Sequence, residues 1–212
     1  MGREFLDIFQ QWAESYDETV SGHDLEYEKV FEHYEDILTK TADRSFGTVL
    51  EFGPGTGNLT LKLIERQRKV IAVEPSLAMR KKAEKKLQGK AILLDGDFLS
   101  FEVNEHIDSI VSTYAFHHLT DEEKAKAFEL YGKMLAKGGK IVFADTMFES
   151  KEAYEETIQQ ALANGFHNLA EDLHREYYTT HEVLRLLAEQ NGFSVTFERC
   201  NDFVWLMEAV KR

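Results

Sequence analysis

The chain is poor in residues that crosslink a protein or anchor it in a membrane. It has a single cysteine, Cys200, so it can form neither an intrachain disulfide nor a cysteine-based zinc site. No stretch approaches the roughly 18 consecutive apolar residues that a membrane-spanning helix needs. Acidic residues interrupt the N-terminal stretch, where a signal peptide would be continuously apolar. We therefore expect a cytoplasmic protein in a reducing compartment.

Positive charge is also scarce. The 212 residues include 25 Lys and Arg against 38 Asp and Glu, which gives a net charge of −13. This balance argues against a nucleic acid or an anionic membrane as partner, because basic side chains bind both. With 2 prolines and 13 glycines, collagen-like and proline-rich classes are excluded. The length and the 43% hydrophobic content suit one folded domain with a modest appendage.

The first forty residues show helical periodicity. Apolar residues recur at helical spacing in two stretches, which Ser21-Gly22 separates. The residues are Phe5, Ile8, Phe9, Trp12 and Tyr16, then Tyr27, Val30, Phe31, Tyr34 and Ile37. This pattern predicts two helices that precede the main body of the chain.

From residue 48 onward, short apolar runs alternate with helical patterns. The runs are 49–52, 70–73, 91–94, 109–113 and 141–144, and the intervening helices are predicted at 59–66, 77–87 and 121–135. Thr120-Asp121-Glu122-Glu123 forms a capping box that begins the last of these helices. Such alternation predicts right-handed crossovers and a parallel sheet buried on both faces.

The C-terminal third departs from this alternation. Residues 150–163 and 168–176 read as inserted helices, and a further helix is capped at Thr180. Two strand-like runs, 194–200 and 203–210, are separated only by Asn201-Asp202, which is too short for a parallel crossover. They must therefore form an antiparallel hairpin. The fold class is predicted as α/β, a Rossmann-like, doubly wound, mostly parallel seven-stranded sheet with an antiparallel C-terminal hairpin strand.

A glycine-rich loop follows the first predicted strand. In Glu51-Phe52-Gly53-Pro54-Gly55-Thr56-Gly57-Asn58, the glycines allow the backbone to pass close to a ligand. Asn58 departs from the dinucleotide-binding pattern, and the Gly-Lys-Ser/Thr of a phosphate loop is absent. A tight turn without a ligand is the alternative.

Carboxylates follow the next two strands. Glu74 ends the strand 70–73, where a carboxylate can accept hydrogen bonds from both hydroxyls of a ribose. Asp97 follows the strand 91–94 and can accept from an adenine amino group, with Phe98 over the ring face. The alternative is that both carboxylates are ordinary turn residues.

As a set, these segments resemble the class I S-adenosylmethionine-dependent methyltransferases, of the small-molecule type exemplified by quinone-biosynthesis methyltransferases. The resemblance covers roughly residues 45–146. The matching segments are Glu51–Gly57, Val73–Met79, Gly96–Phe98, Tyr114–Leu119 and Lys137–Ile141. It implies S-adenosyl-L-methionine as cofactor, S-adenosyl-L-homocysteine as product, and transfer of a methyl group to an acceptor by in-line displacement. Tyr16-Asp17 also resembles a pair whose aromatic ring closes over the cofactor in this family.

The resemblance also implies which residues bind the cofactor and how the chain is divided. The expected cofactor-binding residues are Tyr16, Glu51, Gly53, Gly55, Gly57, Glu74, Pro75, Met79, Asp97, Phe98 and Thr113. We expect an N-terminal helical lid at 1–45, a cofactor-binding core at 46–146, a helical insertion covering the substrate at 147–180, and a last helix with the terminal hairpin at 181–212.

Catalytic residues are less clearly indicated. His117 and His118 follow the fourth strand, and one of them is a candidate general base; the alternative is structural packing. We predict no metal site, since no pair of histidines has a compact ligand spacing with carboxylate support. The expected partner is a small-molecule methyl acceptor, with the chain a monomer or a homodimer. An NAD-dependent oxidoreductase and a non-catalytic S-adenosylmethionine-binding protein are the alternative functions.

Overall fold

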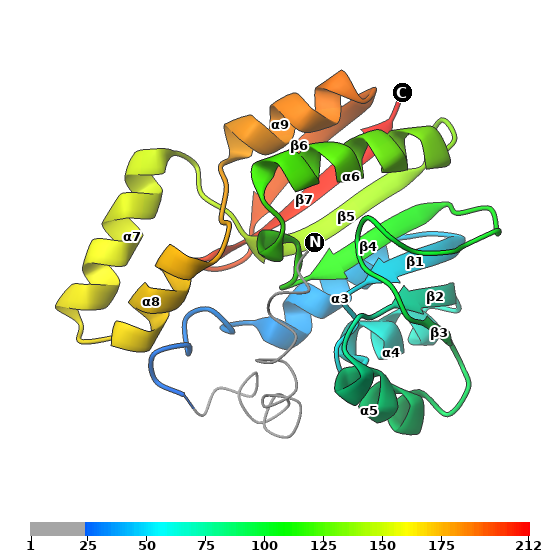
Figure 1. Ribbon diagram of the computed structural model, residues 1–212, viewed down its shortest axis with the longest axis horizontal. Helices are drawn as coiled ribbons and strands as arrows, with labels where there is room; N and C mark the ends of the chain where they lie inside the picture. The colour runs from blue at the N-terminus through cyan, green and yellow to red at the C-terminus, as the bar shows by residue number, and fades with distance from the viewer. Residues whose placement is uncertain (1–23) are drawn as a thin grey trace.

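The computed structural model describes residues 24–212, and a seven-stranded sheet forms its centre (Figure 1). The strand order is β3-β2-β1-β4-β5-β7-β6. The strands are β1 Thr48–Phe52, β2 Lys69–Val73, β3 Ile92–Leu94, β4 Ser109–Thr113, β5 Lys140–Thr146, β6 Phe193–Arg199 and β7 Val204–Lys211. The first predicted helix, with Trp12 and Tyr16, lies outside the described residues.

The pairing of the strands confirms the predicted fold. β1 pairs in parallel with both β2 and β4, β2 with β3, and β4 with β5. β7 runs antiparallel between β5 and β6, as the two-residue turn requires. The carboxyl ends of β1 to β5 therefore share one edge of the sheet, where ligands bind in doubly wound folds.

Helices cover both faces of this sheet (Figure 1). On one side lie α3 Tyr34–Arg44, α4 Asn58–Glu65 and α5 Leu77–Leu87, and on the other α6 Asp121–Met134 and α9 His181–Gln190. Successive residues of a strand point to opposite faces of the sheet. Val49 packs in the cluster with α3 and α4, whereas Leu50 packs with α6 and α9. No helix within residues 24–212 is long and apolar enough to cross a membrane.

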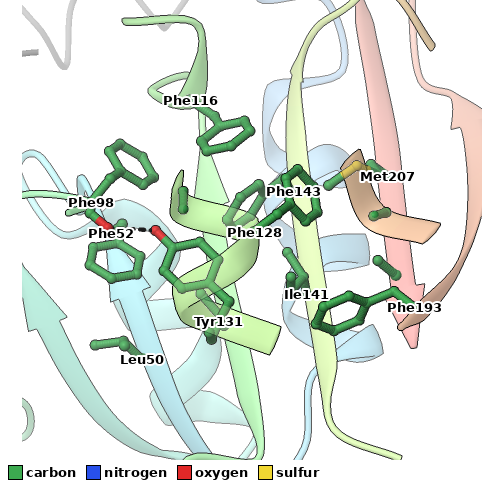
Figure 2. Close-up of a cluster of buried hydrophobic side chains, with 14 of the residues drawn as sticks. Leu50, Phe52, Phe98, Phe116, Phe128, Tyr131, Ile141, Phe143, Phe193 and Met207 are labelled. Atoms are coloured by element: carbon green, nitrogen blue, oxygen red, sulfur yellow. Dashed lines mark hydrogen bonds between the residues drawn. The ribbon is translucent and has the colours of Figure 1, made fainter. Parts of the chain in front are cut away.

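Aromatic rings fill the core beneath α6 (Figure 2). Phe52 stacks on Phe98 with ring centroids 5.0 Å apart and on Tyr131 at 5.5 Å. Phe116 and Phe143 meet beside them at 4.7 Å. The Tyr131 hydroxyl donates to the Phe98 carbonyl at 2.9 Å, the dashed line in Figure 2. The exits of β1, β3 and β4 are thus fixed by one packed cluster.

The starts of α6 and α3 show how far the local sequence determines where a helix begins. α6 begins with the predicted capping box, in which Thr120 and Glu123 exchange side-chain and backbone hydrogen bonds. The second N-terminal helix, by contrast, starts later than the periodicity of Tyr27 and Val30 predicts. Residues 24–33 form turns, and α3 begins only at Tyr34, because His33 adopts a left-handed conformation with φ of 61°.

The insertion after β5 forms two packed helices, α7 Lys151–Ala163 and α8 His167–Arg175. A parallel bridge between Phe148 and Thr180 holds its two ends together. The Tyr154 hydroxyl of α7 donates to the Leu173 carbonyl of α8. Tyr27 donates to Asp172, so the segment before α3 is attached to the insertion.

Asn201, in the turn between β6 and β7, joins the far edge of the sheet to the segment before α3. Its Oδ1 accepts from the backbone of Phe203 and Val204 at 2.8 and 2.6 Å. Its Nδ2 donates to the carbonyls of Val30 and Glu32 at 3.1 and 2.8 Å. The side chain is 8% exposed, so these groups have little access to water.

We predict that Asn201→Asp destabilises the protein by about 2–4 kcal/mol. The carboxylate keeps the acceptors but loses both donors, and it places negative charge against two carbonyl oxygens. Urea unfolding of the two proteins measures the difference. The neighbouring control Asp202→Asn removes only exposed ion pairs and should cost less than about 1 kcal/mol. Equal effects would mean that the buried amide does not fix this turn.

Candidate active site

The glycine loop leaves β1 at the carboxyl edge of the sheet. Gly53, Gly55 and Gly57 have positive φ angles of 65°, 57° and 92°. The Gly53 amide donates to Val73 of β2 at 3.0 Å, which keeps the loop against the next strand. A Cβ added at Gly53 would lie 2.8 Å from the Ala115 Cβ, so no larger residue fits there. The loop therefore needs glycine at this position, both for its backbone conformation and for its close packing against Ala115.

Glu74 lies directly after β2 and supports this loop. Its Oε2 accepts from the Gly55 amide at 3.1 Å and its Oε1 from the Ser76 amide at 2.8 Å. The side chain is buried, and burial raises the pKa of Glu74 to about 7. Each oxygen retains a lone pair, so the carboxylate can accept further hydrogen bonds from ligand hydroxyls.

Glu51, in β1, is a second buried carboxyl beside the first. Thr60 donates to its Oε2 at 2.7 Å, while its Oε1 is buried without a hydrogen-bond partner among the described residues. Burial raises the pKa of Glu51 to about 8, and the charge of Glu74 adds to this effect. An acceptor left unsatisfied in this way is costly, and a cationic or hydrogen-bonding ligand group would satisfy it.

Asp97 and Phe98 follow β3. Asp97 is buried, and its Oδ1 accepts from the amides of Leu99 and Ser100 at 3.0 and 2.9 Å. These bonds form a tight turn, the alternative weighed for this residue. Phe98 is 7% exposed and packs in the core between Phe52 and Phe116. Its predicted role over an adenine ring stays a prediction, and its packing is that of a core residue.

The other predicted cofactor residues lie near the same edge. Thr113 ends β4 and is partly buried, Pro75 follows Glu74, and Met79 is buried in the first turn of α5. Thr56 and Asn58 of the loop both accept from Lys86 of α5, at 3.0 and 2.7 Å. The cofactor roles of these residues remain predictions. Tyr16 lies outside the described residues.

His117 lies in the short 3-10 helix η3, Phe116–His118, which follows β4. Its Nδ1 is 2.6 Å from Asp145 Oδ1 and its Nε2 is 3.0 Å from Glu176 Oε2. Burial alone would lower the pKa of His117, but the charges of Asp145 and Glu176 outweigh it and raise the pKa to about 10. Burial lowers the pKa of His118 to about 3, and the charge of His117 acts in the same direction.

The sequence indicated neither partner of His117. Asp145 lies within β5, in a run that reads as a buried strand, and Glu176 follows α8 far along the chain. The segment 176–178 is pinned to η3 because the Tyr177 amide donates to the His117 carbonyl at 3.0 Å. Lys124 of α6, 1% exposed, donates to the Tyr177 carbonyl at 2.6 Å. The prediction that one of the two histidines is a general base remains untested by these contacts.

Comparison with known proteins identifies the class. The family described as "Methyltransferase domain" matches residues 25–197. An uncharacterized methyltransferase of Geobacillus kaustophilus is 59% identical over 213 residues, covering 100% of this chain and 99% of the relative. One of Bacillus cereus is 55% identical over 212 residues, covering 100% of both.

Solved structures share the fold at low identity. Magnesium protoporphyrin IX methyltransferase from Synechocystis PCC 6803, crystallised with S-adenosylhomocysteine, has a TM-score of 0.76 at 14% identity and covers 100% of both chains. A possible histamine N-methyltransferase from Thermotoga maritima has a TM-score of 0.68 at 17% identity, covering 98% of this chain and 100% of its own. The chain therefore belongs to the methyltransferase family, and its fold is that of the class I S-adenosylmethionine-dependent methyltransferases. These findings give no support to the oxidoreductase alternative.

The residues at the carboxyl edge fit this cofactor. Within residues 24–212, Glu51 Oε1 is buried without a hydrogen-bond partner, which suits the ammonium of the methionine part. Glu74 presents carboxylate oxygens, which suit the ribose hydroxyls. Gly53 carries no side chain, and none fits there beside Ala115.

The burial of Glu51 predicts a specific pH dependence of stability. Its folded pKa, about 8, lies above the ordinary value of 4.5, so the folded state binds the proton more tightly. Stability is therefore lost as pH rises from about 4.5 to about 8. Glu51→Gln should remove about 2–5 kcal/mol of this loss, because each pKa unit corresponds to about 1.4 kcal/mol.

Urea unfolding on either side of this pH range tests the prediction. The control Glu65→Gln, at an exposed position on α4, should follow the wild-type pH profile. Glu74 has a raised pKa as well, so it contributes a loss of stability with rising pH that has the same sign in every variant. If the Glu51→Gln profile also matched the wild type, Glu51 would titrate normally in the folded protein.

Proposed function

We propose that the protein transfers a methyl group from S-adenosylmethionine to a small, partly apolar molecule. The observation that carries the proposal is a cavity of about 320 Å³, which lies next to the carboxyl end of β5 and the start of β7. Met147 and Phe148 at the exit of β5 line it, and α7, α8 and the β6–β7 turn enclose it. The helices α7 and α8 belong to the insertion at 147–180, which the sequence predicts to cover the substrate.

One segment of chain links the cavity to the glycine loop. Glu26 and Lys29 line the cavity, and the same segment continues to Tyr34, whose hydroxyl accepts from Asn58 at 3.2 Å. Between them, the Tyr114 ring, just after β4, packs against Phe31 with centroids 5.3 Å apart. An acceptor in the cavity and a cofactor at the loop would thus contact the two ends of one short segment.

The lining indicates the class of acceptor. Phe148, Phe166, Phe203 and Trp205 give the cavity an apolar side. Its cations, Lys29 and Arg199, both pair with Asp202, whereas it also contains the carboxylates of Glu26, Glu149 and Glu156. An excess of carboxylates disfavours an anionic acceptor. We therefore infer an acceptor that combines an apolar body with a neutral or cationic group.

When bound, S-adenosylmethionine supplies a methyl group activated by a sulfonium. The chain's own residues need only orient the acceptor atom, hold the cofactor and exclude water. Glu51, Glu74 and the glycine loop hold the cofactor, and the insertion encloses the acceptor. An in-line displacement of this kind needs a general base only where the acceptor atom carries a proton at neutral pH.

We predict that Glu74→Gln weakens binding of S-adenosylmethionine by about 5- to 150-fold, which corresponds to about 1–3 kcal/mol. The substitution replaces one acceptor oxygen by a donor that faces a backbone amide. Calorimetry measures the affinity, and the control Glu84→Gln, exposed on α5, should bind normally. Unchanged affinity in a folded Glu74→Gln protein, or tighter binding of NAD than of S-adenosylmethionine, would contradict the assignment.

Turnover tests the acceptor cavity. A screen of small-molecule pools for formation of S-adenosylhomocysteine should reveal an acceptor. Ala153→Phe fills the cavity from α7, so we expect it to raise the KM for that acceptor at least about 10-fold with unchanged cofactor affinity. Leu162→Phe, exposed on the opposite face of the same helix, should leave the KM unchanged. Equal KM values for the two variants would place the acceptor elsewhere.

A further inference from the structure

His117, His118 and Glu176 form a cluster outside the residues assigned to the cofactor. One ligand atom from each lies within 4.8 Å of the other two. The closest pair, His117 Nε2 and Glu176 Oε2, is 3.0 Å apart. In a tetrahedral site with metal–nitrogen distances of about 2.0–2.1 Å, neighbouring ligand atoms are about 3.3 Å apart. The cluster therefore needs only small side-chain movements to surround an ion.

The backbone brings these residues together independently of their side chains. His117 and His118 belong to η3, and Glu176 begins the segment that the Tyr177 amide ties to the His117 carbonyl. Lys124 fixes the same segment from α6. Because the backbone holds both sides of the cluster, the ligand set is largely preformed, which lowers the ordering cost of binding.

The surroundings of His117 resemble those of a metal-bound histidine. Asp145 Oδ1 lies 2.6 Å from Nδ1, and Asp145 Oδ2 accepts from the His117 amide at 2.9 Å, so the carboxylate is fixed at two points. Metal-bound histidines commonly donate their second ring N–H to such a carboxylate. On the other side, the Tyr178 hydroxyl donates to Glu176 Oε2 at 2.9 Å, and the Tyr178 ring stacks on His117.

The contact between His117 Nε2 and Glu176 Oε2 needs a proton or a metal ion on the nitrogen. If Nδ1–H donates to Asp145, the Nε2 lone pair faces a carboxylate oxygen at 3.0 Å, which is repulsive unless a proton or a metal ion lies between them. A proton needs only these two groups. The cluster contains a third ligand, His118, whose ring centroid lies 4.2 Å from that of His117. A metal ion uses all three ligands.

We propose that His117, His118 and Glu176 bind one divalent transition-metal ion of the zinc class. Asp145 and Tyr178 orient the ligands, and the fourth position stays open to water or another molecule. Two imidazoles and one carboxylate suit zinc and its neighbours, whereas magnesium and calcium prefer oxygen ligands. The sequence predicted no metal site, because Glu176 is far from the two histidines along the chain. In the folded protein, Glu176 lies next to them. The proposal does not rest on methyl transfer.

Metal titration of the full chain without an affinity tag tests the site. After treatment with a chelator, the protein should bind one Co²⁺ per chain. The bound ion should give the strong visible absorption of a four- or five-coordinate site, and Zn²⁺ should then displace it. His118→Ala and Glu176→Gln should each weaken Co²⁺ binding more than about 10-fold, and Asp145→Asn by about 10- to 100-fold.

Two controls separate a metal site from a structural ion pair. His167→Ala, at an exposed histidine that begins α8, should bind Co²⁺ as the wild type does. Unfolding without metal should show that His118→Ala is folded; if it is not, His118→Gln replaces it in the titration. Absence of Co²⁺ absorption in the wild type would overturn the proposal. Full Co²⁺ binding by a folded His118 variant would also overturn the proposal. The contact between His117 and Glu176 would then be explained by a proton alone.

Discussion

The parallel pairing of β1 with β2 and with β4 is the constraint on which the site depends. It places the glycine loop, Glu74 and η3 side by side at one edge, although they lie far apart in the sequence. The aromatic cluster around Phe52 then fixes the distance between the exits of β1, β3 and β4. Side chains at this edge therefore act as a unit, and a change in the core beneath them would alter the site.

Most of the scaffold could be predicted because its determinants are local. The alternation of short apolar runs with amphipathic helices predicted five strands, and two further apolar runs predicted the last two, all to within two residues; the capping box marked the start of α6. The two-residue turn dictated the antiparallel hairpin, since no crossover fits in that length. The start of α3 could not be read in this way. The apolar periodicity continues through Tyr27 and Val30, and the left-handed conformation of His33 has no clear local cause in the sequence.

The site was only partly predictable. Glycines and carboxylates at strand exits have a spacing that indicates a ligand, so the loop and Glu74 were found in the sequence. The partners of His117 were not: Asp145 lies beside it because β5 pairs with β4, and Glu176 reaches it only because the insertion folds back over η3. Pattern alone also could not show that Phe98 is a core residue. A ring beside a turn can point either way, and packing against Phe52 and Phe116 decides its direction.

The two buried carboxyls lower the stability of this fold at neutral pH. Glu51 and Glu74 both have raised pKa values, so each is held in the folded protein at a cost in free energy. A core made only for stability would place apolar residues there. Their retention is explained if a bound molecule recovers part of that cost, in which case the stability of the protein increases with the concentration of its ligand.

The tie between Asn201 and residues 30–32 has a consequence for how the chain can be divided. It makes the last two strands part of the same structural unit as the segment before α3, although these lie at opposite ends of the described chain. The β6–β7 turn also forms one wall of the cavity through Phe203. Cutting away the terminal hairpin would therefore open the cavity and remove this tie to the segment before α3 at once. The strands β1 to β5 alone do not complete the walls of this cavity.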